Sequence, residues 1–298
     1  MKILYITGWC RTGSTLLGNL LAEPEGVAHV GELAYLWNNG VLRDGTNSTC
    51  GCGKDLRDCP VWSGTLTGEA AARDQVRRHD LHLRTRHTRA RLAEARQRKP
   101  KSPQVVRTLR HKADLYAKIA RILDADTLID SSKFPAEAAA LCGLPDLDVR
   151  VLHLVRDPRA TAHSWRRAKD YIPPMSVTRS TAYWTAFNLA SDRIGIAFPD
   201  RYLRVRYEDF TAHPARTLAT ISAWAELPAA PAITPEGTAT LGENHTVTGN
   251  PDRLRRGEIR IRLDDAWTRD LPPKEATIST ALALPLLAKY GYPLTLPR

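Results

Sequence analysis

The sequence lacks a long apolar run. A membrane-spanning helix needs about 20 consecutive apolar residues, and no stretch of this 298-residue chain approaches that length. The first apolar stretch, KILYITGWC at residues 2–10, is also too short for the core of a signal peptide, and Arg11 interrupts it. We therefore expect neither a membrane span nor a secretory leader.

The sequence contains few cysteines, and their number is odd. Five cysteines in a chain of this length favour a reducing compartment over a disulfide scaffold, so we expect a cytoplasmic protein. The abundance of Ala and Arg is typical of a high-GC bacterial genome.

Aromatic residues are missing from the most basic part of the chain. Between Arg73 and Lys112 there are 14 Lys and Arg and only three acidic residues, whereas the rest of this +11 chain is neutral. Single-stranded nucleic acids are bound by stacking bases on aromatic rings, and the first aromatic residue after this segment is Tyr116. We therefore expect no nucleic-acid partner. The segment either contacts an anionic lipid or another anionic partner, or forms a solvated helix that adds solubility.

Short apolar runs alternate with helix-like stretches along most of the chain. This alternation predicts an α/β fold of three layers, in which helices cover both faces of a central parallel sheet. Ligands bind at the carboxyl edge of such sheets. The predicted strands are 2–6, 126–132, 149–156 and 202–207, and the predicted helices are 14–22, 135–142, 158–169, about 178–197 and 213–226.

Residues 65–122 interrupt this alternation. They hold few apolar positions before Leu109, and Pro100 and Pro103 divide them into two predicted helices. We expect a basic helical insertion or lid within a single domain that spans residues 1–298.

The stretch TGWCRTGSTLLGNLL, residues 7–21, has the layout of a phosphate-binding loop without its lysine. Gly8 and Gly13 have the spacing of the motif G-x-x-x-x-G-K-[ST], but Ser14 occupies the lysine position. A strand–turn–helix loop directs backbone N–H groups at an anion, and an arginine in the turn can donate two further hydrogen bonds. The alternative is a purely structural turn. The candidate phosphate ligands are Arg11, Thr12, Gly13, Ser14 and Thr15.

The missing lysine weakens an interpretation as an ATP-dependent kinase. Such an enzyme usually combines the loop lysine with an aspartate that holds Mg²⁺. Asp130, near the end of a predicted strand, could supply that carboxylate, so a small-molecule kinase remains the alternative. A donor that transfers a group other than a γ-phosphoryl group fits this loop better.

A second phosphate site is predicted within VLHLVRDPRATAHSW, residues 151–165. A strand ends at Arg156, and Pro158 suits the first position of the helix that follows. Arg156 and Ser164 can therefore converge on one anion across the strand–helix junction.

These motifs together resemble the PAPS-dependent sulfotransferases, which transfer a sulfuryl group from 3′-phosphoadenosine 5′-phosphosulfate (PAPS) to a hydroxyl or amine and release PAP. CRTGSTLL resembles their 5′-phosphosulfate loop, and LVRDPRATAHS resembles their 3′-phosphate site. An arginine in the loop is similar to the tyrosylprotein branch and many bacterial members. The resemblance implies that Tyr207 in RVRYEDF lies near the adenine. It also implies a late Gly/Arg-rich loop at 245–267 that closes over the 3′ end through Arg253, Arg255 and Gly257.

The resemblance also implies which groups perform the chemistry. Arg11 is expected to stabilise the leaving phosphate, and Lys133, at the end of another predicted strand, to contact its bridging oxygen. Glu32 in VGELAYLW is the expected base, and His29 is its rival. A lone histidine in an apolar strand usually packs in the hydrophobic core. Three other histidines are therefore weaker candidates for the base. These are His153, His163 and His245.

Three cysteines lie close together in CGCGKDLRDCPVW, residues 50–62. Zinc sites prefer C-x-x-C spacings and four ligands, and Cys50, Cys52 and Cys59 depart from that pattern, so we predict no metal. A similar stretch occurs in bacterial members of the family, and we expect it to shape the acceptor side.

The motifs do not specify the acceptor. The resemblance implies a hydroxyl of a small molecule, sugar or lipid, and bacterial members of the family act in secondary metabolism. Variable loops build acceptor pockets, here 33–66 and the basic insertion. We therefore expect residues 73–112 to face the acceptor or an anionic lipid and not the donor.

Overall fold

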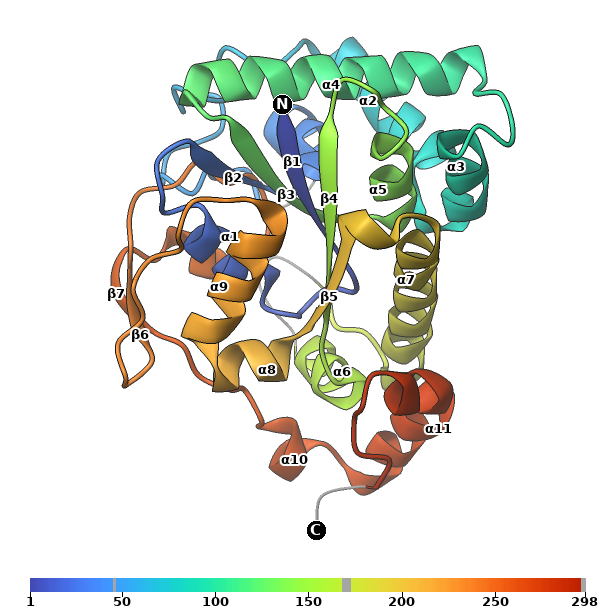
Figure 1. Cartoon of the computed structure of the whole chain (residues 1–298), viewed down its shortest axis with the longest axis vertical. Coiled ribbons are helices and arrows are strands. Elements are labelled where there is room, and N and C mark those ends of the chain that lie inside the picture. The colour runs from blue at the N-terminus through green and yellow to red at the C-terminus, as the bar shows by residue number, and fades with distance from the viewer. Residues whose placement is uncertain (45–46, 168–172, 296–298) are drawn as a thin grey trace.

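A five-stranded parallel sheet forms the centre of the molecule (Figure 1). The computed structural model describes residues 1–44, 47–167 and 173–295. The strand order is β2-β3-β1-β4-β5, and every neighbouring pair is parallel. The strands are β1 (Lys2–Thr7), β2 (Val27–Gly31), β3 (Thr127–Lys133), β4 (Asp148–Val155) and β5 (Tyr202–Arg206). The sequence pattern predicted four of these strands and missed β2, a short edge strand that contains a histidine.

Side chains of β1 explain why helices cover both faces of the sheet. Ile3 and Tyr5 point into one apolar core, and Leu4 and Ile6 point into another, all with no exposed surface. A strand that is apolar on both faces must be covered on both faces to bury its side chains. The predicted α/β architecture with a central parallel sheet is confirmed.

The first core is closed by α4, α5 and α7, and the second by α1, α8, α9 and a small antiparallel pair of strands, β6 (Thr238–Leu241) and β7 (Gly257–Arg260) (Figure 1). The helices are α1 (Ser14–Leu21), α2 (Glu69–His82), α3 (Thr88–Ala95), α4 (Pro103–Leu123), α5 (Pro135–Leu141), α6 (Pro158–Arg166), α7 (Val177–Ala197), α8 (Tyr207–Ala212), α9 (Pro214–Ala225), α10 (Trp267–Asp270) and α11 (Pro273–Lys289). Shorter helical turns occupy Leu33–Tyr35, Leu36–Leu42, Thr85–His87, Pro199–Arg201 and Pro251–Leu254. The end of the helix predicted at 158–169 falls on residues outside the described ranges.

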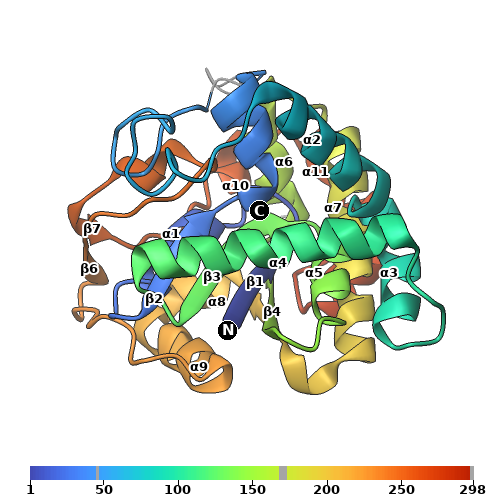
Figure 2. The same cartoon turned by 90° about the horizontal axis from the view of Figure 1, so that it is seen from above.

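The basic segment forms three helices where the sequence predicted two. Residues before Pro100 fold into α2 and α3, because the chain turns between His82 and Thr88. α4 begins at Pro103, and Ser102 caps it by accepting a hydrogen bond from the backbone N–H of Val105. One face of α4 is apolar and packs on the sheet, with α2 and α3 on the same side of the molecule (Figure 2). Whether this segment also acts as a lid remains a prediction.

A third apolar cluster lies beyond the carboxyl ends of β1 and β4. It joins α6, α7 and α11 through Trp9, Trp165, Trp184 and Leu286. Trp9 and Trp165 stack with ring centroids 5.7 Å apart. This cluster supports the loop that follows β1. Within the described ranges, none of the helices combines the length and apolarity that crossing a bilayer requires.

Candidate active site

Four neighbouring strands bring the predicted catalytic groups to one edge. Glu32 follows β2, Lys133 ends β3, the loop at 8–13 follows β1, and Arg156 follows β4. Because these strands are parallel and adjacent in the order β2-β3-β1-β4, their carboxyl ends lie side by side. The sheet therefore places two cations, one carboxylate and a Gly-rich turn along one edge.

Glu32 and Lys133 form an ion pair at this edge. The Lys133 ammonium also donates to the Ser131 carbonyl at 3.0 Å, and both side chains of the pair are largely buried. Burial alone would lower the pKa of Lys133, but the charge of Glu32 and a hydrogen bond to it outweigh burial and raise that pKa. The ammonium is thus held charged, next to the Glu32 carboxylate.

The backbone at Lys133 has an uncommon conformation. Its φ of +73° lies in the left-handed region, and the register between β1 and β3 shifts between Tyr5 and Thr7. A lysine at positive φ costs free energy and persists only where the surrounding structure imposes it, which is frequent at functional sites. The shift turns the end of β3 so that the ammonium meets Glu32.

A distant segment fixes the backbone of Glu32. The Glu32 N–H donates to the Val247 carbonyl at 2.8 Å, and Val247 N–H donates to the Val30 carbonyl at 3.0 Å. Gly31 has φ +78°, and a Cβ there would lie 2.3 Å from the Val247 carbonyl oxygen, so this position requires glycine. A Cβ on Gly249 would lie 3.2 Å from Thr15 Oγ1 and 3.7 Å from Glu32 Oε1. Residues 247–249 therefore lie against both Glu32 and the loop after β1.

The loop after β1 has a compact, left-handed backbone. Arg11 has φ +70° and Gly13 has φ +79°, and Gly13 directly precedes α1. Thr12 is buried and its hydroxyl donates to the Trp9 carbonyl at 3.3 Å, so that hydroxyl stabilises the turn itself. The Arg11 guanidinium lies 5.1 Å from the centroid of the Trp165 ring. Ser14 is buried and Thr15 is half-buried, both at the amino end of α1.

Arg156 joins three of the predicted cofactor motifs. Its guanidinium donates to the Arg11 carbonyl at 3.0 Å and lies 4.4 Å from the centroid of the Tyr207 ring. A Cβ on Gly13 would lie 2.9 Å from the same ring, so the tyrosine packs on the phosphate loop. Arg156 also donates to the backbone carbonyl and carboxylate of Asp264, at 2.7 and 3.0 Å. Burial alone would raise the pKa of Asp264, but Arg156 lowers it.

The remaining predicted ligands are spread more widely. Ser164 lies half-buried on α6. Arg253 is buried and its guanidinium donates to Asn47 Oδ1 at 2.6 Å and the Thr49 carbonyl at 2.9 Å, so it tethers the loop before the cysteine-rich stretch. Arg255 is exposed and pairs with Asp252 at 3.0 Å, and Gly257 begins β7. A contact of Arg253, Arg255 or Gly257 with a 3′-phosphate therefore stays a prediction.

The geometry favours Glu32 over His29 as the base. His29 is 4% exposed, and hydrogen bonds join its Nδ1 to the Asn19 side chain at 2.7 Å and its Nε2 to Ser131 Oγ at 3.0 Å. Burial, with a smaller contribution from Lys133, lowers its pKa to about 3. Both ring nitrogens are thus engaged within the protein. His153 is also fully buried, between α7 and β5, and burial lowers its pKa to about 4.

Asp130, the candidate Mg²⁺ ligand of a kinase, is unavailable at this edge. It has no exposed surface and accepts hydrogen bonds from Tyr116 Oη at 2.6 Å and Ser132 N–H at 2.8 Å. Lys112 Nζ lies 3.3 Å from the same carboxylate. Asp130 therefore belongs to a buried polar network, which the sequence pattern did not reveal.

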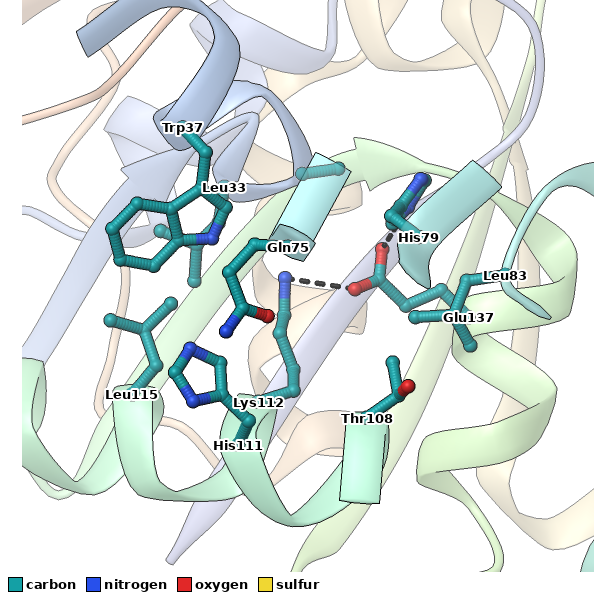
Figure 3. A pocket seen from close by; sticks show the side chains of 11 residues that line it. Leu33, Trp37, Gln75, His79, Leu83, Thr108, His111, Lys112, Leu115 and Glu137 are labelled. Atoms are coloured by element: carbon teal, nitrogen blue, oxygen red, sulfur yellow. Dashed lines mark ion pairs between the residues drawn. The ribbon is translucent and has the colours of Figure 1, made fainter. Parts of the chain in front are cut away.

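This network borders a small cavity of about 30 Å³ between α2, α4 and the turn after Glu32 (Figure 3). Lys112 from α4 and His79 from α2 both point toward Glu137, with N···O distances of 2.8 and 3.5 Å. Burial alone would raise the pKa of Glu137, but Lys112 and His79 lower it. The cavity has room for about one water molecule, so it is too small for an organic acceptor.

The basic segment reaches the catalytic edge through Arg84. Its guanidinium lies 4.9 Å from the ring centroid of Phe134, the residue that follows Lys133 in the chain. The Arg84 side chain also hydrogen-bonds the side chain of Tyr35. Burial raises the pKa of Tyr35, Cys10 and Glu32 raise it further, and Arg84 opposes them. Arg84 therefore brings the segment at 73–112 against Tyr35 and Phe134, which lie close in the chain to Glu32 and Lys133.

A parallel sheet with a Gly-rich anion loop, a strand-end arginine and a Lys–Glu pair at one edge defines a P-loop-like group-transfer enzyme. The chain matches the model of the sulfotransferase family over residues 4–231. That match covers more than half of the chain, so the protein belongs to the sulfotransferase family, as the motifs predicted.

Individual relatives agree with this assignment. Carbohydrate sulfotransferase 3 of Mus musculus is 26% identical over 170 residues, which span 50% of this chain and only 35% of that protein. The sulfotransferase domain of the Synechococcus PCC 7002 olefin synthase has the same fold, with a TM-score of 0.59, 23% identity, and coverage of 99% of this chain and 96% of that one. The sulfotransferase domain of the curacin biosynthetic pathway has a TM-score of 0.53, 17% identity and 98% coverage of both chains.

Proposed function

We propose that this protein transfers the sulfuryl group of PAPS to a hydroxyl group of a small-molecule, sugar or lipid acceptor. The observation that carries the proposal is the ion pair of Glu32 and Lys133 beside a lysine-free phosphate loop. PAPS has a 5′-phosphosulfate and a 3′-phosphate but no γ-phosphate, and the proposal assigns two separate anion sites to this edge. The kinase alternative loses its Mg²⁺ ligand because Asp130 is buried and bonded within the protein.

In this proposal the two anion sites hold the two ends of the donor. The 5′-phosphosulfate lies at the amino end of α1, where the backbone N–H groups after Gly13, the hydroxyls of Ser14 and Thr15, and Arg11 surround it. The 3′-phosphate lies against Arg156 and Ser164. It competes with the Asp264 carboxylate for the Arg156 guanidinium, which lies over Tyr207 on the adenine side. Arg253, Arg255 and Gly257 belong to the loop that closes over this end.

The proposed chemistry is an in-line displacement at sulfur. Glu32 accepts the proton of the acceptor hydroxyl while the hydroxyl oxygen forms a bond to sulfur and the bond from sulfur to the bridging oxygen breaks. Lys133 and Arg11 stabilise the negative charge that develops on the bridging oxygen and the leaving phosphate of PAP. The acceptor hydroxyl enters between the Glu32 carboxylate and the Lys133 ammonium, so their direct contact opens during the reaction.

The acceptor side is proposed to lie next to Tyr35, Phe134 and Arg84. Tyr35 and Phe134 closely follow Glu32 and Lys133 in the chain, and Arg84, which the basic segment contributes, contacts both. The likeness to a carbohydrate sulfotransferase supports a sugar hydroxyl among the possible acceptors. A role in bacterial secondary metabolism fits the composition, and a cytoplasmic location fits five cysteines that form no disulfide.

Calorimetric titration with PAP, ADP, ATP and AMP tests this proposal. PAP and ADP each have two phosphate groups and differ only in where the second phosphate is attached. AMP differs from PAP only by the absence of the 3′-phosphate. We expect PAP to bind at least tenfold more tightly than ADP or AMP, without Mg²⁺. Tighter binding of ATP in the presence of Mg²⁺ would support the kinase instead.

A further inference from the structure

Four potential metal ligands from distant parts of the chain meet at one point. Cys50, Cys52 and Cys59 lie in one loop, and His245 follows β6, more than 180 residues later. Their ligand atoms, three sulfurs and one ring nitrogen, all lie within 4.8 Å of one another. The cysteines at 50 and 59 have no exposed surface, and the other two ligands are half-buried.

The separations fit a tetrahedral metal ion and not a disulfide. The sulfurs of Cys50 and Cys59 are 3.5 Å apart, and His245 Nδ1 lies 3.7 and 3.3 Å from them. Tetrahedral zinc, with bonds of about 2.3 Å to sulfur and 2.0 Å to nitrogen, holds two sulfurs about 3.8 Å apart and sulfur from nitrogen about 3.5 Å apart. A disulfide requires about 2.05 Å between sulfurs. The ligand atoms are therefore arranged as the corners of a coordination shell.

Backbone N–H groups point at two of the four ligand atoms, the sulfurs of Cys50 and Cys59. The N–H of Cys52 hydrogen-bonds the Cys50 sulfur, and the N–H groups of Val61 and Trp62 hydrogen-bond the Cys59 sulfur. Gly53, at φ +86°, allows the tight turn in which the Cys50 N–H donates to the Lys54 carbonyl at 2.8 Å. Hydrogen bonds of this kind orient and stabilise thiolate ligands of a metal ion.

His245 has the supports of a metal-ligating histidine. Nδ1 faces the sulfurs, and Nε2 faces Glu243 Oε1 at 3.8 Å. A carboxylate beside the distal nitrogen is typical of histidine ligands because it fixes the tautomer and the ring orientation. The backbone is also anchored, since the Trp62 indole donates to the His245 carbonyl at 2.8 Å.

We propose that Cys50, Cys52, Cys59 and His245 bind one structural zinc ion. Three thiolates and an imidazole suit zinc better than a hard cation, and four protein ligands leave no open position for catalysis. The sequence pattern predicted no metal because the C-x-C spacing is unusual and the fourth ligand lies far along the chain.

The ion ties the loop at 50–62 to the segment that holds Glu32 in place. His245 lies two residues before Val247, whose carbonyl accepts the hydrogen bond of the Glu32 N–H. The Gly51 N–H donates to the Thr246 carbonyl at 2.9 Å, and a Cβ on Gly51 would collide with Asn244 at 1.9 Å. Zinc therefore has a mechanical role in the proposal: it clamps two loops that contact the catalytic edge.

Metal analysis of the intact protein, purified without added chelator from zinc-containing medium, tests the proposal. We expect elemental mass spectrometry to find about one zinc ion per chain. Cobalt exchanged into the site should show tetrahedral ligand-field bands and sulfur-to-cobalt charge transfer. The variants His245→Ala and Cys52→Ser should lower zinc affinity by more than tenfold. His245→Cys should keep the metal because it retains four ligands.

Cys142→Ala provides the matched control, because Cys142 is also a buried free cysteine but lies outside the cluster. It should keep the full zinc content and the cobalt spectrum. Glu243→Gln should fold normally and weaken zinc binding by about 10- to 100-fold. The proposal is overturned if the folded wild-type protein binds no zinc, or if its cobalt spectrum lacks thiolate charge transfer. It is also overturned if the mass of the denatured, unreduced protein shows a disulfide between Cys50 and Cys59. None of these measurements depends on sulfuryl transfer.

Discussion

Replacement of Arg156 with alanine should remove the preference for a 3′-phosphate. In the free protein this guanidinium makes one hydrogen bond to the loop carbonyl of Arg11 and two to Asp264. A bound 3′-phosphate would replace the Asp264 carboxylate and leave the Arg11 contact in place. A charge-assisted hydrogen bond contributes about 1.5–3 kcal/mol, which corresponds to about 10- to 150-fold in Kd. Because release of Asp264 costs part of this gain, we expect a loss of PAP affinity in the lower half of that range.

The same reasoning predicts that Asp264→Asn strengthens PAP binding by several-fold, since the phosphate then displaces a neutral side chain. Both variants are titrated calorimetrically with PAP and with AMP, and the ratio of the two Kd values isolates the 3′-phosphate. Arg150→Ala is the matched control, because Arg150 is an ion-paired arginine at the other end of β4. An equal loss of PAP and AMP affinity in Arg156→Ala would refute the assignment and show that Arg156 only supports the loop.

Three further predictions follow from the geometry. Glu32→Gln should lower kcat by about 10²–10⁴ and leave the Kd for PAP unchanged. If His29→Asn lowers kcat by that factor and Glu32→Gln leaves kcat unchanged, His29 is the base. Arg84→Gln should raise the KM for the acceptor and keep the Kd for PAP within about twofold. Replacement of the exposed Arg98 with Gln should change neither value. If Arg84→Gln also weakens PAP binding by more than twofold, the basic segment is a lid over the donor. Finally, the free energy of unfolding from urea titrations should fall as the pH drops from 7 to 5. The pKa of His29 is about 3 in the folded chain, below its ordinary value of about 6.5, so the unfolded chain binds the proton first and His29 alone lowers stability below pH 6.5, by about 2 kcal/mol at pH 5. Buried His153, with a pKa of about 4, lowers stability over the same range. His29→Asn should therefore remove its own part of the decline and leave that of His153, and an unchanged slope would contradict the buried, neutral histidine.

The parallel sheet could be predicted because its strands are apolar on both faces and leave strong signals in the sequence. The sequences of β1 and β3 are typical of buried strands, and the turn between β1 and α1 was predicted from its glycines. That this turn binds phosphate stays a prediction. β2 was missed because it is a short edge strand whose histidine breaks the apolar run. The adjacency of Glu32 and Lys133 follows from the strand order β2-β3, which no local pattern encodes.

Long-range contacts explain what the sequence did not reveal. The composition of the basic segment does not distinguish its arginines, yet Arg91 is buried and paired with Glu94, and Arg84 reaches Phe134. Arg253 belongs to a Gly/Arg-rich motif, but its guanidinium binds the loop at 47–49. Spacing along a chain predicts which residues share a helix face, whereas partners more than 200 residues away are set by the fold.

A crystal structure of the protein with PAP tests the central claim most directly. The proposal predicts the 5′-phosphate at the amino end of α1, within about 3 Å of Lys133 Nζ or the Arg11 guanidinium. It places the 3′-phosphate on Arg156 and Ser164, with Asp264 displaced and the adenine beside Tyr207. PAP bound away from this edge, or with its 3′-phosphate on the Lys133 side and its 5′-phosphate on Arg156, would contradict the account.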